Sequence, residues 1–284
     1  MTGIIDVGGG MRGIYGAGVL DRCLDDGVSL DYCCGVSAGS ANMCAYLAGQ
    51  RGRNYRYYHD YSFRKEYMSV DNLRRKGAYL DLHYVYATLS NSDGEDPLDY
   101  EAMMRNPAQL VVVATDAKTN APKYFTKQDF GPDRYEVIKA SCTIPIVCNT
   151  TLVGGREYFD GGLTDPLPIE KALADGCGKV VVILTRPVDY VPDRSGERMA
   201  PLIDRLMKKY PASARSVFTR HDVYVKQLER CLELQKEGKV LIVAPDDTCG
   251  VDTLKRTPET LDALYRKGYE DGGKIAGFHR NRKM

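Results

Sequence analysis

The sequence predicts an α/β protein built around a mainly parallel sheet, and three observations lead to this class. An apolar strand pattern at residues 2–7 is followed by helical spacing at residues 14–24 and a second strand at residues 30–35, the unit from which parallel sheets are built. Two further apolar runs, at residues 110–116 and 179–184, indicate buried strands. With 284 residues, 43% of them hydrophobic, the chain is long enough to bury a large core.

Composition and charge argue against several functional classes. The 39 basic and 38 acidic residues nearly cancel, so no overall field favours a nucleic acid as the partner. No apolar run reaches the length of a membrane span, and the first residues lack the basic and apolar stretches of a signal peptide. Nine cysteines are scattered and lack the paired spacing of a zinc site. We therefore expect a cytoplasmic protein with reduced thiols, no metal and no nucleic-acid partner.

A serine framed by glycines is the first candidate for chemistry. Residues 35–39 have the sequence GVSAG, the G-x-S-x-G form of a nucleophile elbow, in which a strand ends, turns sharply and enters a helix. The flanking glycines leave room for the crossing strand and helix, so the turn exposes the Ser37 hydroxyl and directs the N–H of Ala38 to the same point. Such a short pattern also occurs by chance, and a turn without chemistry stays open at this point.

A glycine cluster follows the first strand and has two interpretations. Gly8, Gly10 and Gly13 fit the G-x-G-x-x-G pattern of dinucleotide-binding sites, which also requires an acidic residue at the end of the second strand. That strand ends instead in the elbow, and Asp31 lies at its beginning. The other interpretation is that the backbone N–H groups of this loop form an anion site beside Ser37, suited to the oxyanion of acyl transfer.

Residues 50–100 differ from the rest because arginines and lysines alternate with tyrosines. The segment has no clear strand, and residues 91–97 form a plain loop. We expect a variable helical insertion that caps the site, with basic and aromatic groups suited to phosphate headgroups and acyl chains. The alternative is that the tyrosines pack the helices on the core while the charges are solvated.

Further elements follow in order along the chain. We expect a hairpin partner from residue 123, helices at 135–140, 169–174, 199–210, 223–234 and 258–272, and a strand at 240–245. The chain closes with a basic tail that includes His279, Arg280, Arg282 and Lys283. A solvated end is the expectation for this tail, and contact with acidic lipid is the alternative.

An activated serine needs a base that accepts its proton. The chain has four histidines: His59, His83, His221 and His279. None lies at the end of an expected core strand, where a rigid catalytic partner belongs. Asp160 does lie at such a position, between a short strand and two glycines. Asp6 and Asp116 are competing carboxylates, and either is equally well explained as a structural cap.

Four blocks in order resemble one family. They are GGGMRG at residues 8–13, GVSAG at 35–39, Ala140-Ser141 followed by Pro145, and DGG at 160–162. Together they resemble the patatin-like phospholipases over residues 3–185, and residues 186–284 resemble the C-terminal extension of a bacterial branch of that family. The resemblance implies a three-layer α/β/α fold with a central, mostly parallel sheet. Residues 1–185 are then the catalytic domain, with 50–100 as its cap, and residues 186–284 are a C-terminal α/β extension.

Position by position, the resemblance implies a Ser–Asp dyad without a histidine. Ser37 corresponds to the nucleophile and Asp160 to the base. The oxyanion hole is expected to comprise Gly8, Gly9, Gly10, Arg12 and Ala38. Asp165 departs from the family pattern, because members often have Asn after the D-G-G turn, and this difference concerns local hydrogen bonding.

The resemblance therefore implies a serine-dependent lipid acyl hydrolase of the phospholipase A or esterase type, which works through an acyl-serine intermediate without a cofactor. Its partner is then a phospholipid or another acyl ester, and a cytoplasmic protein with peripheral membrane contact is expected. Two alternatives stay open. A non-catalytic regulatory or lipid-binding protein can share the scaffold, although Ser37 and Asp160 are both present. An acyltransferase to an acceptor other than water would use the same residues.

Overall fold

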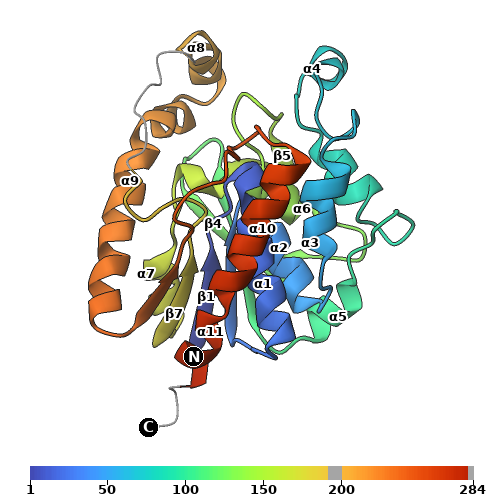
Figure 1. The fold of residues 1–284 in the computed structure, drawn as a ribbon. Coiled ribbons are helices and arrows are strands. Elements are labelled where there is room, and N and C mark those ends of the chain that lie inside the picture. Colours follow the sequence, from blue (N-terminus) through green and yellow to red (C-terminus); the bar gives the residue numbers. More distant parts are fainter. Residues whose placement is uncertain (191–199, 281–284) are drawn as a thin grey trace.

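A mixed sheet with helices on both faces forms the centre of the molecule (Figure 1). The structure, a computed structural model, describes residues 1–190 and 200–280. Residue 199, where we expected a helix to begin, and the basic tail residues Arg282 and Lys283 lie outside the described part. Across the described sheet the strands follow the order β5 (Thr151–Val153), β6 (Arg156–Asp160), β3 (Gln109–Asp116), β2 (Tyr32–Val36), β1 (Thr2–Asp6), β7 (Lys179–Ile183) and β8 (Val240–Val243). An eighth strand, β4 (Pro122–Thr126), is outside this order and pairs with β3.

Strand direction divides the sheet into two parts. β3, β2, β1, β7 and β8 run parallel to one another, whereas β4 and β6 pair with β3, and β5 with β6, in the antiparallel direction. The expected fold class, a three-layer α/β/α fold with a mostly parallel sheet, is confirmed by this topology and by the helices on the two faces. The expected hairpin partner of β3 is also confirmed as β4.

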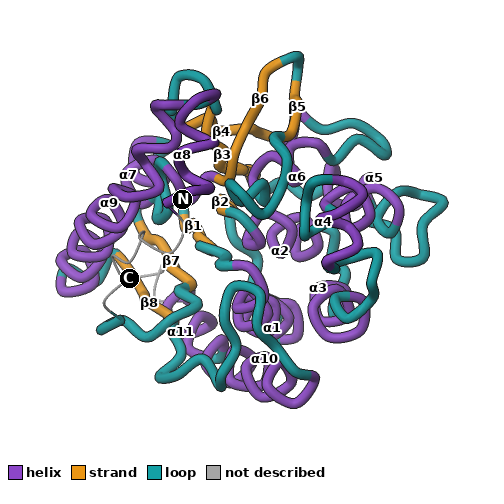
Figure 2. The backbone as a smooth tube through the Cα atoms, turned by 90° about the horizontal axis from the view of Figure 1, so that it is seen from above, coloured by secondary structure: helices purple, strands orange, loops and turns teal. Residues whose placement is uncertain are grey.

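Alternation along the strands produces two separate apolar cores. Ile4 and Val181 point to one face, and their neighbours Ile5 and Val182 point to the other. Helices α1 (Ile14–Asp25), α2 (Ala38–Leu47) and α10 (Pro258–Gly272) cover the first face, and α7 (Ile169–Ala174) and α9 (Pro211–Lys236) cover the second (Figure 2). A parallel sheet buried on both faces explains why its strands are almost continuously apolar.

The expected insertion at residues 50–100 is helical. It contains α3 (Arg53–Arg56), α4 (Val70–Lys76) and two π-helical turns, η2 (Tyr57–Tyr61) and η3 (Tyr84–Thr88), and α5 (Tyr100–Arg105) begins where it ends. Tyr57, Tyr58, Tyr61 and Tyr67 are buried, so these tyrosines pack inside the protein, as the alternative interpretation held. Arg56 forms a bidentate pair with the buried carboxylate of Asp96, at 2.7 and 2.9 Å, which ties the insertion together.

The C-terminal residues continue the same sheet. β8 pairs in parallel with β7, so the sheet runs across the boundary expected at residue 185. α10 packs closely on α1, and the remaining helices of this region are α8 (Ala200–Lys209) and α11 (Lys274–Arg280). Among the described helices, none has the length and apolar character needed to cross a bilayer.

Candidate active site

Ser37 occupies a strained turn between β2 and α2. Its backbone has φ 55° and ψ −133°, a combination that non-glycine residues rarely adopt. The neighbouring glycines make the turn sterically feasible. A Cβ at Gly35 would lie 2.4 Å from the Cα of Ser40, and one at Gly39 would lie 2.2 Å from the carbonyl oxygen of Asp6. The local sequence therefore produces the elbow geometry expected from the G-x-S-x-G pattern.

A second serine holds this turn in place. The Oγ of Ser141, at the end of α6 (Glu136–Ser141), accepts a hydrogen bond of 2.9 Å from the backbone N–H of Ser37. The same Oγ donates a 2.6 Å bond to the carbonyl of Val113. Ser141 belongs to the third block of the sequence pattern, but nothing in the sequence indicated this bridging contact.

Asp160 reaches the serine because two strands share one edge of β3. β2 pairs with β3 as far as the Val36–Val113 partners, and β4 occupies the opposite edge. β6 continues where β2 stops, with Asp160 opposite Ala114. The final residue of β6 thus comes directly after the final residue of β2 along the same edge. The structure therefore brings Ser37 and Asp160 together.

The environment of Asp160 is buried and polar. Burial raises the pKa of its carboxyl group above the ordinary value, while hydrogen bonds from the Ser37 hydroxyl and from the backbone N–H of Gly162 lower it. The Gly162 N–H lies 2.8 Å from Oδ1. This arrangement leaves a carboxylate of increased basicity beside a hydroxyl group, which is what proton transfer from a serine requires.

The glycine loop packs against the elbow. Gly8, Gly9 and Gly10 all have positive φ values, of 64°, 116° and 62°, which glycine adopts without strain. A Cβ at Gly8 would lie 2.3 Å from the carbonyl oxygen of Val36 and 2.9 Å from the nitrogen of Ala38. Among the described residues, none accepts a hydrogen bond from the N–H groups of Gly9, Gly10 or Ala38. These unpaired donors lie around the elbow.

The buried carboxylate of Asp6 holds the glycine loop through a hydrogen bond. Its two carboxylate oxygens accept hydrogen bonds from the N–H of Gly8, at 2.9 Å, and from the side-chain amide of Asn42, at 2.8 Å. Asn42 in turn accepts a 3.1 Å bond from the hydroxyl of Tyr58. Burial raises the pKa of Asp6 to about 6, and both hydrogen bonds oppose this rise. Asp6 therefore connects the glycine loop to α2 and to the insertion.

The side chain of Arg12, an expected member of the oxyanion hole, contacts the C-terminal region. Its buried guanidinium pairs with the carboxylate of Asp252 and donates a 3.0 Å bond to the hydroxyl of Thr253, both from the C-terminal region. Burial lowers the pKa of Arg12 to about 10, nearby Arg186 lowers it further, and Asp252 opposes the change. Asn42, Asp252 and Thr253 are polar partners of the site that sequence reasoning missed. Asn42 had one local signal, as an amide side chain in a helix of otherwise small or apolar residues.

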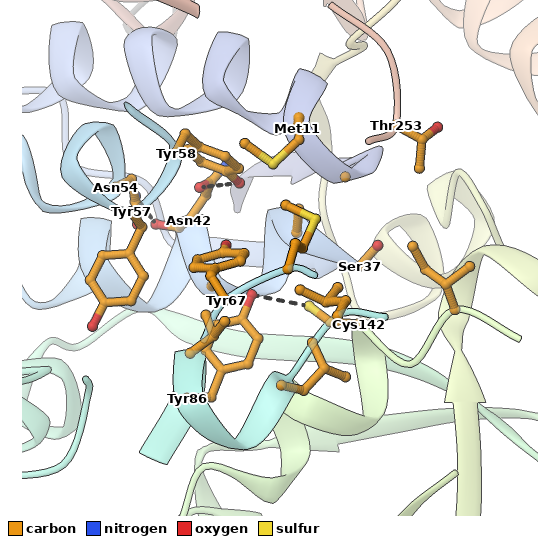
Figure 3. A pocket seen from close by; sticks show the side chains of 18 of the residues that line it. Met11, Ser37, Asn42, Asn54, Tyr57, Tyr58, Tyr67, Tyr86, Cys142 and Thr253 are labelled. Carbon is orange, nitrogen blue, oxygen red and sulfur yellow. Dashed lines mark hydrogen bonds between the residues drawn. The ribbon is translucent and has the colours of Figure 1, made fainter. Parts of the chain in front are cut away.

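A largely apolar pocket opens beside Ser37, with an empty volume of about 640 Å³ that is partly open to solvent. Its walls are mainly aromatic and aliphatic, with contributions from Tyr58, Tyr67, Met68, Leu80, Leu82 and Tyr86. In Figure 3, Ser37 and Thr253 lie toward one end, and Tyr57 and Asn54 lie toward the other. Of the expected site residues, Gly10, Ser37 and Ala38 line the pocket, whereas Gly8, Gly9, Arg12 and Asp160 do not.

The other titratable candidates lie elsewhere. All four histidines are described, and none lines this pocket. Asp116 caps a turn by accepting the N–H groups of Lys118 and Thr119, at 3.0 and 2.9 Å. Asp165 accepts hydrogen bonds from Tyr124 and Gln227, so the departure from the family pattern is accommodated by a tyrosine hydroxyl and an amide. Within the described residues, no group of three or more His, Cys, Asp or Glu side chains is arranged to hold a metal ion.

Comparisons with known proteins agree with the expected family. A family model described as patatin-like phospholipase matches residues 7–173, and a model described as a domain of unknown function, DUF6363, matches residues 210–276. The uncharacterized protein YjjU of Escherichia coli strain K12 is 32% identical over 188 residues, which are 63% of this chain and 50% of that protein. This chain thus spans half the length of that curated relative. The crystal structure of VipD from Legionella pneumophila aligns at 12% identity with a TM-score of 0.48, over 98% of this chain and 67% of that chain.

Proposed function

Because the chain belongs to the patatin-like phospholipase family, we propose that it is a serine-dependent lipid acyl hydrolase with Ser37 as nucleophile and Asp160 as base. One observation carries this proposal. β2 and β6 end at successive positions on the same edge of β3, which brings a strained serine beside a buried carboxylate at an apolar pocket. A nucleophile, an adjacent base and unpaired N–H donors are the parts that ester hydrolysis requires.

The reaction begins when the Oγ of Ser37 attacks the carbonyl carbon of an acyl ester while Asp160 accepts the hydroxyl proton. The tetrahedral oxyanion takes hydrogen bonds from the free N–H groups of Gly9, Gly10 and Ala38, each worth about 3–4 kcal/mol in comparable sites. Collapse of this intermediate breaks the ester bond, and the leaving alcohol takes the proton from Asp160. Water then attacks the acyl-serine with Asp160 as base, which releases the fatty acid and restores Ser37.

The pocket indicates which part of the substrate lies beside Ser37. Its aromatic and aliphatic walls favour an acyl chain over a charged headgroup, because burial of apolar surface contributes about 25 cal/mol per Å². Two tyrosine hydroxyls of the pocket are already engaged with other side chains, that of Tyr58 with Asn42 and that of Tyr86 with Cys142. The headgroup is therefore expected to remain on the solvent side of the ester bond.

Peripheral contact with a membrane is part of this proposal. Phe63, Val70 and Leu73 expose 45%, 56% and 46% of their surfaces, on a stretch bounded by the pocket residues Tyr58 and Leu80. Figure 1 places α4 at the same end of the molecule as β5, away from the N-terminus. The stretch also carries basic side chains: Lys65, Arg74, Arg75 and Lys76. Exposed apolar groups beside basic ones are suited to a lipid surface with acidic headgroups.

Labelling with a fluorophosphonate tests the nucleophile. We expect stoichiometric modification of the wild-type protein at Ser37, and loss of both labelling and ester hydrolysis in Ser37→Ala. Ser92→Ala is the matched control, because Ser92 is exposed and, among the residues that the structure describes, its side chain hydrogen-bonds only to Asp133. Labelling that persists in Ser37→Ala, or moves to Ser40 or Ser141, would contradict the assignment.

Product analysis separates this proposal from its alternatives. A protein that binds lipid without chemistry would release no fatty acid from a panel of acyl esters and phospholipids. An acyltransferase would yield a new ester in place of free fatty acid when alcohol acceptors are supplied. Mass spectrometry of the products distinguishes the three outcomes, and free fatty acid as the main product supports the hydrolase.

A further inference from the structure

We propose that residues 251–256, here called the strap, position the glycine loop for catalysis, so that the C-terminal region is a working part of the active site. This inference rests on the proposed function, because it assigns a role in the same reaction. The strap belongs to the region between β8 and α10, for which the matching family model gives no function.

The strap contacts three successive residues of the loop. The backbone N–H of Met11 donates a 3.0 Å hydrogen bond to the carbonyl oxygen of Thr253. The guanidinium of Arg12 binds the hydroxyl of Thr253, at 3.0 Å, and the carboxylate of Asp252. A Cβ at Gly10 would lie 2.3 Å from the same carbonyl oxygen of Thr253. Glycine is therefore required at position 10 partly because the strap approaches the backbone there.

The charges explain why Asp252 is needed. Arg12 is buried and its Nε has no hydrogen-bond partner among the described residues, so its polar contacts come from Asp252 and Thr253. Asp252 also accepts a 3.2 Å bond from Arg186, which lies close enough to Arg12 to lower the pKa of its guanidinium. One carboxylate thus serves two neighbouring cations. Without it, Arg12 would be a buried charge beside a like charge, which strongly disfavours its present position.

The strap is itself held at both ends. Val251 is buried in the core, and Arg256 donates hydrogen bonds to the hydroxyl of Ser62, at 2.9 Å, and to its carbonyl oxygen. Thr253 and Leu254 also line the pocket beside Ser37, and Thr253 is labelled in Figure 3. A segment fixed to the core and to the insertion can hold the loop with its N–H groups toward the oxyanion. Asp252 and Thr253 are positioning residues, since they act through Gly10, Met11 and Arg12.

The experiment compares Asp252→Asn and Thr253→Val with wild-type protein. Kinetics on a short soluble acyl ester give kcat and KM, thermal unfolding gives the midpoint, and hydrogen exchange of a peptide covering residues 7–13 reports the order of the loop. A misplacement of about 1 Å can cost about 100-fold in rate. We expect kcat per folded molecule to fall about 10- to 100-fold with little change in KM, and exchange of the loop amides to become faster, while the midpoint stays above the assay temperature. Asp252→Glu, which retains the carboxylate, should recover most of the lost kcat.

Asp246→Asn is the matched control. Asp246 lies in the same connection, but in the described part of the chain its carboxylate binds Lys267 and the backbone N–H of Asp247 and does not contact the glycine loop, so the variant should leave kcat and loop exchange unchanged. Unchanged exchange at residues 7–13 in both strap variants would overturn the inference, whatever their activity. Faster exchange with unchanged kcat would also overturn it, because the loop would then be ordered by the strap without benefit to catalysis. A wild-type protein that neither hydrolyses esters nor reacts with a fluorophosphonate would refute the proposed function instead, and faster exchange in the variants would still support ordering of the loop by the strap.

Discussion

Strain at the single residue Ser37 is maintained by its surroundings. A non-glycine residue held in a sparsely populated backbone region costs on the order of 1–3 kcal/mol. The turn persists because Ser141 binds its N–H and Gly35 and Gly39 let the strand and helix approach. The same surroundings place the hydroxyl beside Asp160, whose pKa is raised mainly by burial. The two residues that carry the proposed chemistry thus depend on contacts from β3, α2 and α6.

Asp160→Asn tests the base. The substitution retains shape but removes the proton acceptor, so we expect kcat to fall by about 10²–10⁴-fold while the fold survives. Asp116→Asn is the control, because Asp116 caps a turn at the end of β3, and it should retain turnover per folded molecule. Steady-state hydrolysis and the thermal midpoint are measured for each variant. A near wild-type rate in Asp160→Asn would mean that another group is the base.

Since the pKa of Asp160 is raised and the ionised form is the base, the wild-type kcat/KM should rise with pH through a value above 3.8.

The raised pKa of Asp6 leads to a prediction of how the free energy of unfolding depends on pH. Its pKa is about 6 in the folded protein against an ordinary value of 3.8, so between these values the folded state binds more protons than the unfolded state. The free energy of unfolding should therefore fall as pH rises through this window, by about 3 kcal/mol for this group. Denaturant unfolding at pH values across the window measures the effect. In Asp6→Asn the fall should be smaller by a similar amount, and an identical pH dependence in the two proteins would contradict the assignment.

Two glycines set the distance between the elements α1 and α10. A Cβ at Gly18 would lie 2.2 Å from the carbonyl oxygen of Tyr265, and one at Gly268 would lie 2.1 Å from the carbonyl oxygen of Tyr15. The two helices therefore meet backbone to backbone. α1 directly follows the glycine loop, and α10 directly follows the strap region, so this contact aligns the two parts that meet beside Ser37.

Gly268→Ala tests this helix contact. The added methyl group collides with α1, and overpacking of this kind costs about 1–3 kcal/mol. We expect a lower thermal midpoint together with a lower kcat, because α1 carries the glycine loop. Gly277→Ala in α11 is the control, since nothing lies within 4 Å of its Cβ position, and it should be neutral or stabilising by up to about 1 kcal/mol. Equal midpoints for the two variants would argue against a backbone-to-backbone contact.

The apolar stretch around α4 is tested as an element. In Phe63→Ser/Leu73→Ser, we expect weaker binding to vesicles that contain phosphatidylglycerol and slower hydrolysis of vesicle lipid, with unchanged hydrolysis of a soluble short-chain ester. The physical reason is the loss of apolar surface available to the bilayer. Leu232→Ser is the control, because Leu232 is 36% exposed on α9, on the opposite side of the sheet. Vesicle sedimentation that is equal for the two variants would exclude this stretch as the contact surface.

At the scale of the whole molecule, one sheet joins the N-terminal and C-terminal parts. β8 adds to β7, α9 covers the same face of the sheet as α7, and α10 lies with α1 over the other face. Residues that match two different family models contribute strands to this one sheet, since one model matches residues 7–173 and the other residues 210–276. The proposed division at residue 185 thus describes sequence families, whereas the apolar cores on both faces draw residues from either side of it.

Periodicity in the sequence correctly located most of the elements. β1, α1, β3, β7 and α10 all lie where their apolar patterns placed them, because alternation and helical spacing are local properties of the chain. The short strand β5 was missed. It has three residues, of which Leu152 is exposed, and so carries no burial pattern that sequence analysis can detect.

For the candidate site, the sequence by itself determined the residue types and their local turns. GVSAG specifies the elbow, and the glycines of residues 8–10 specify a loop of positive φ, because both depend on sterics within a few residues. Only the tertiary structure decided that Asp160 follows β2 along β3, that Ser141 bridges Ser37 to Val113, and that the strap covers Gly10. These contacts join residues far apart in the chain, and they form only when the sheet and both helical layers pack together.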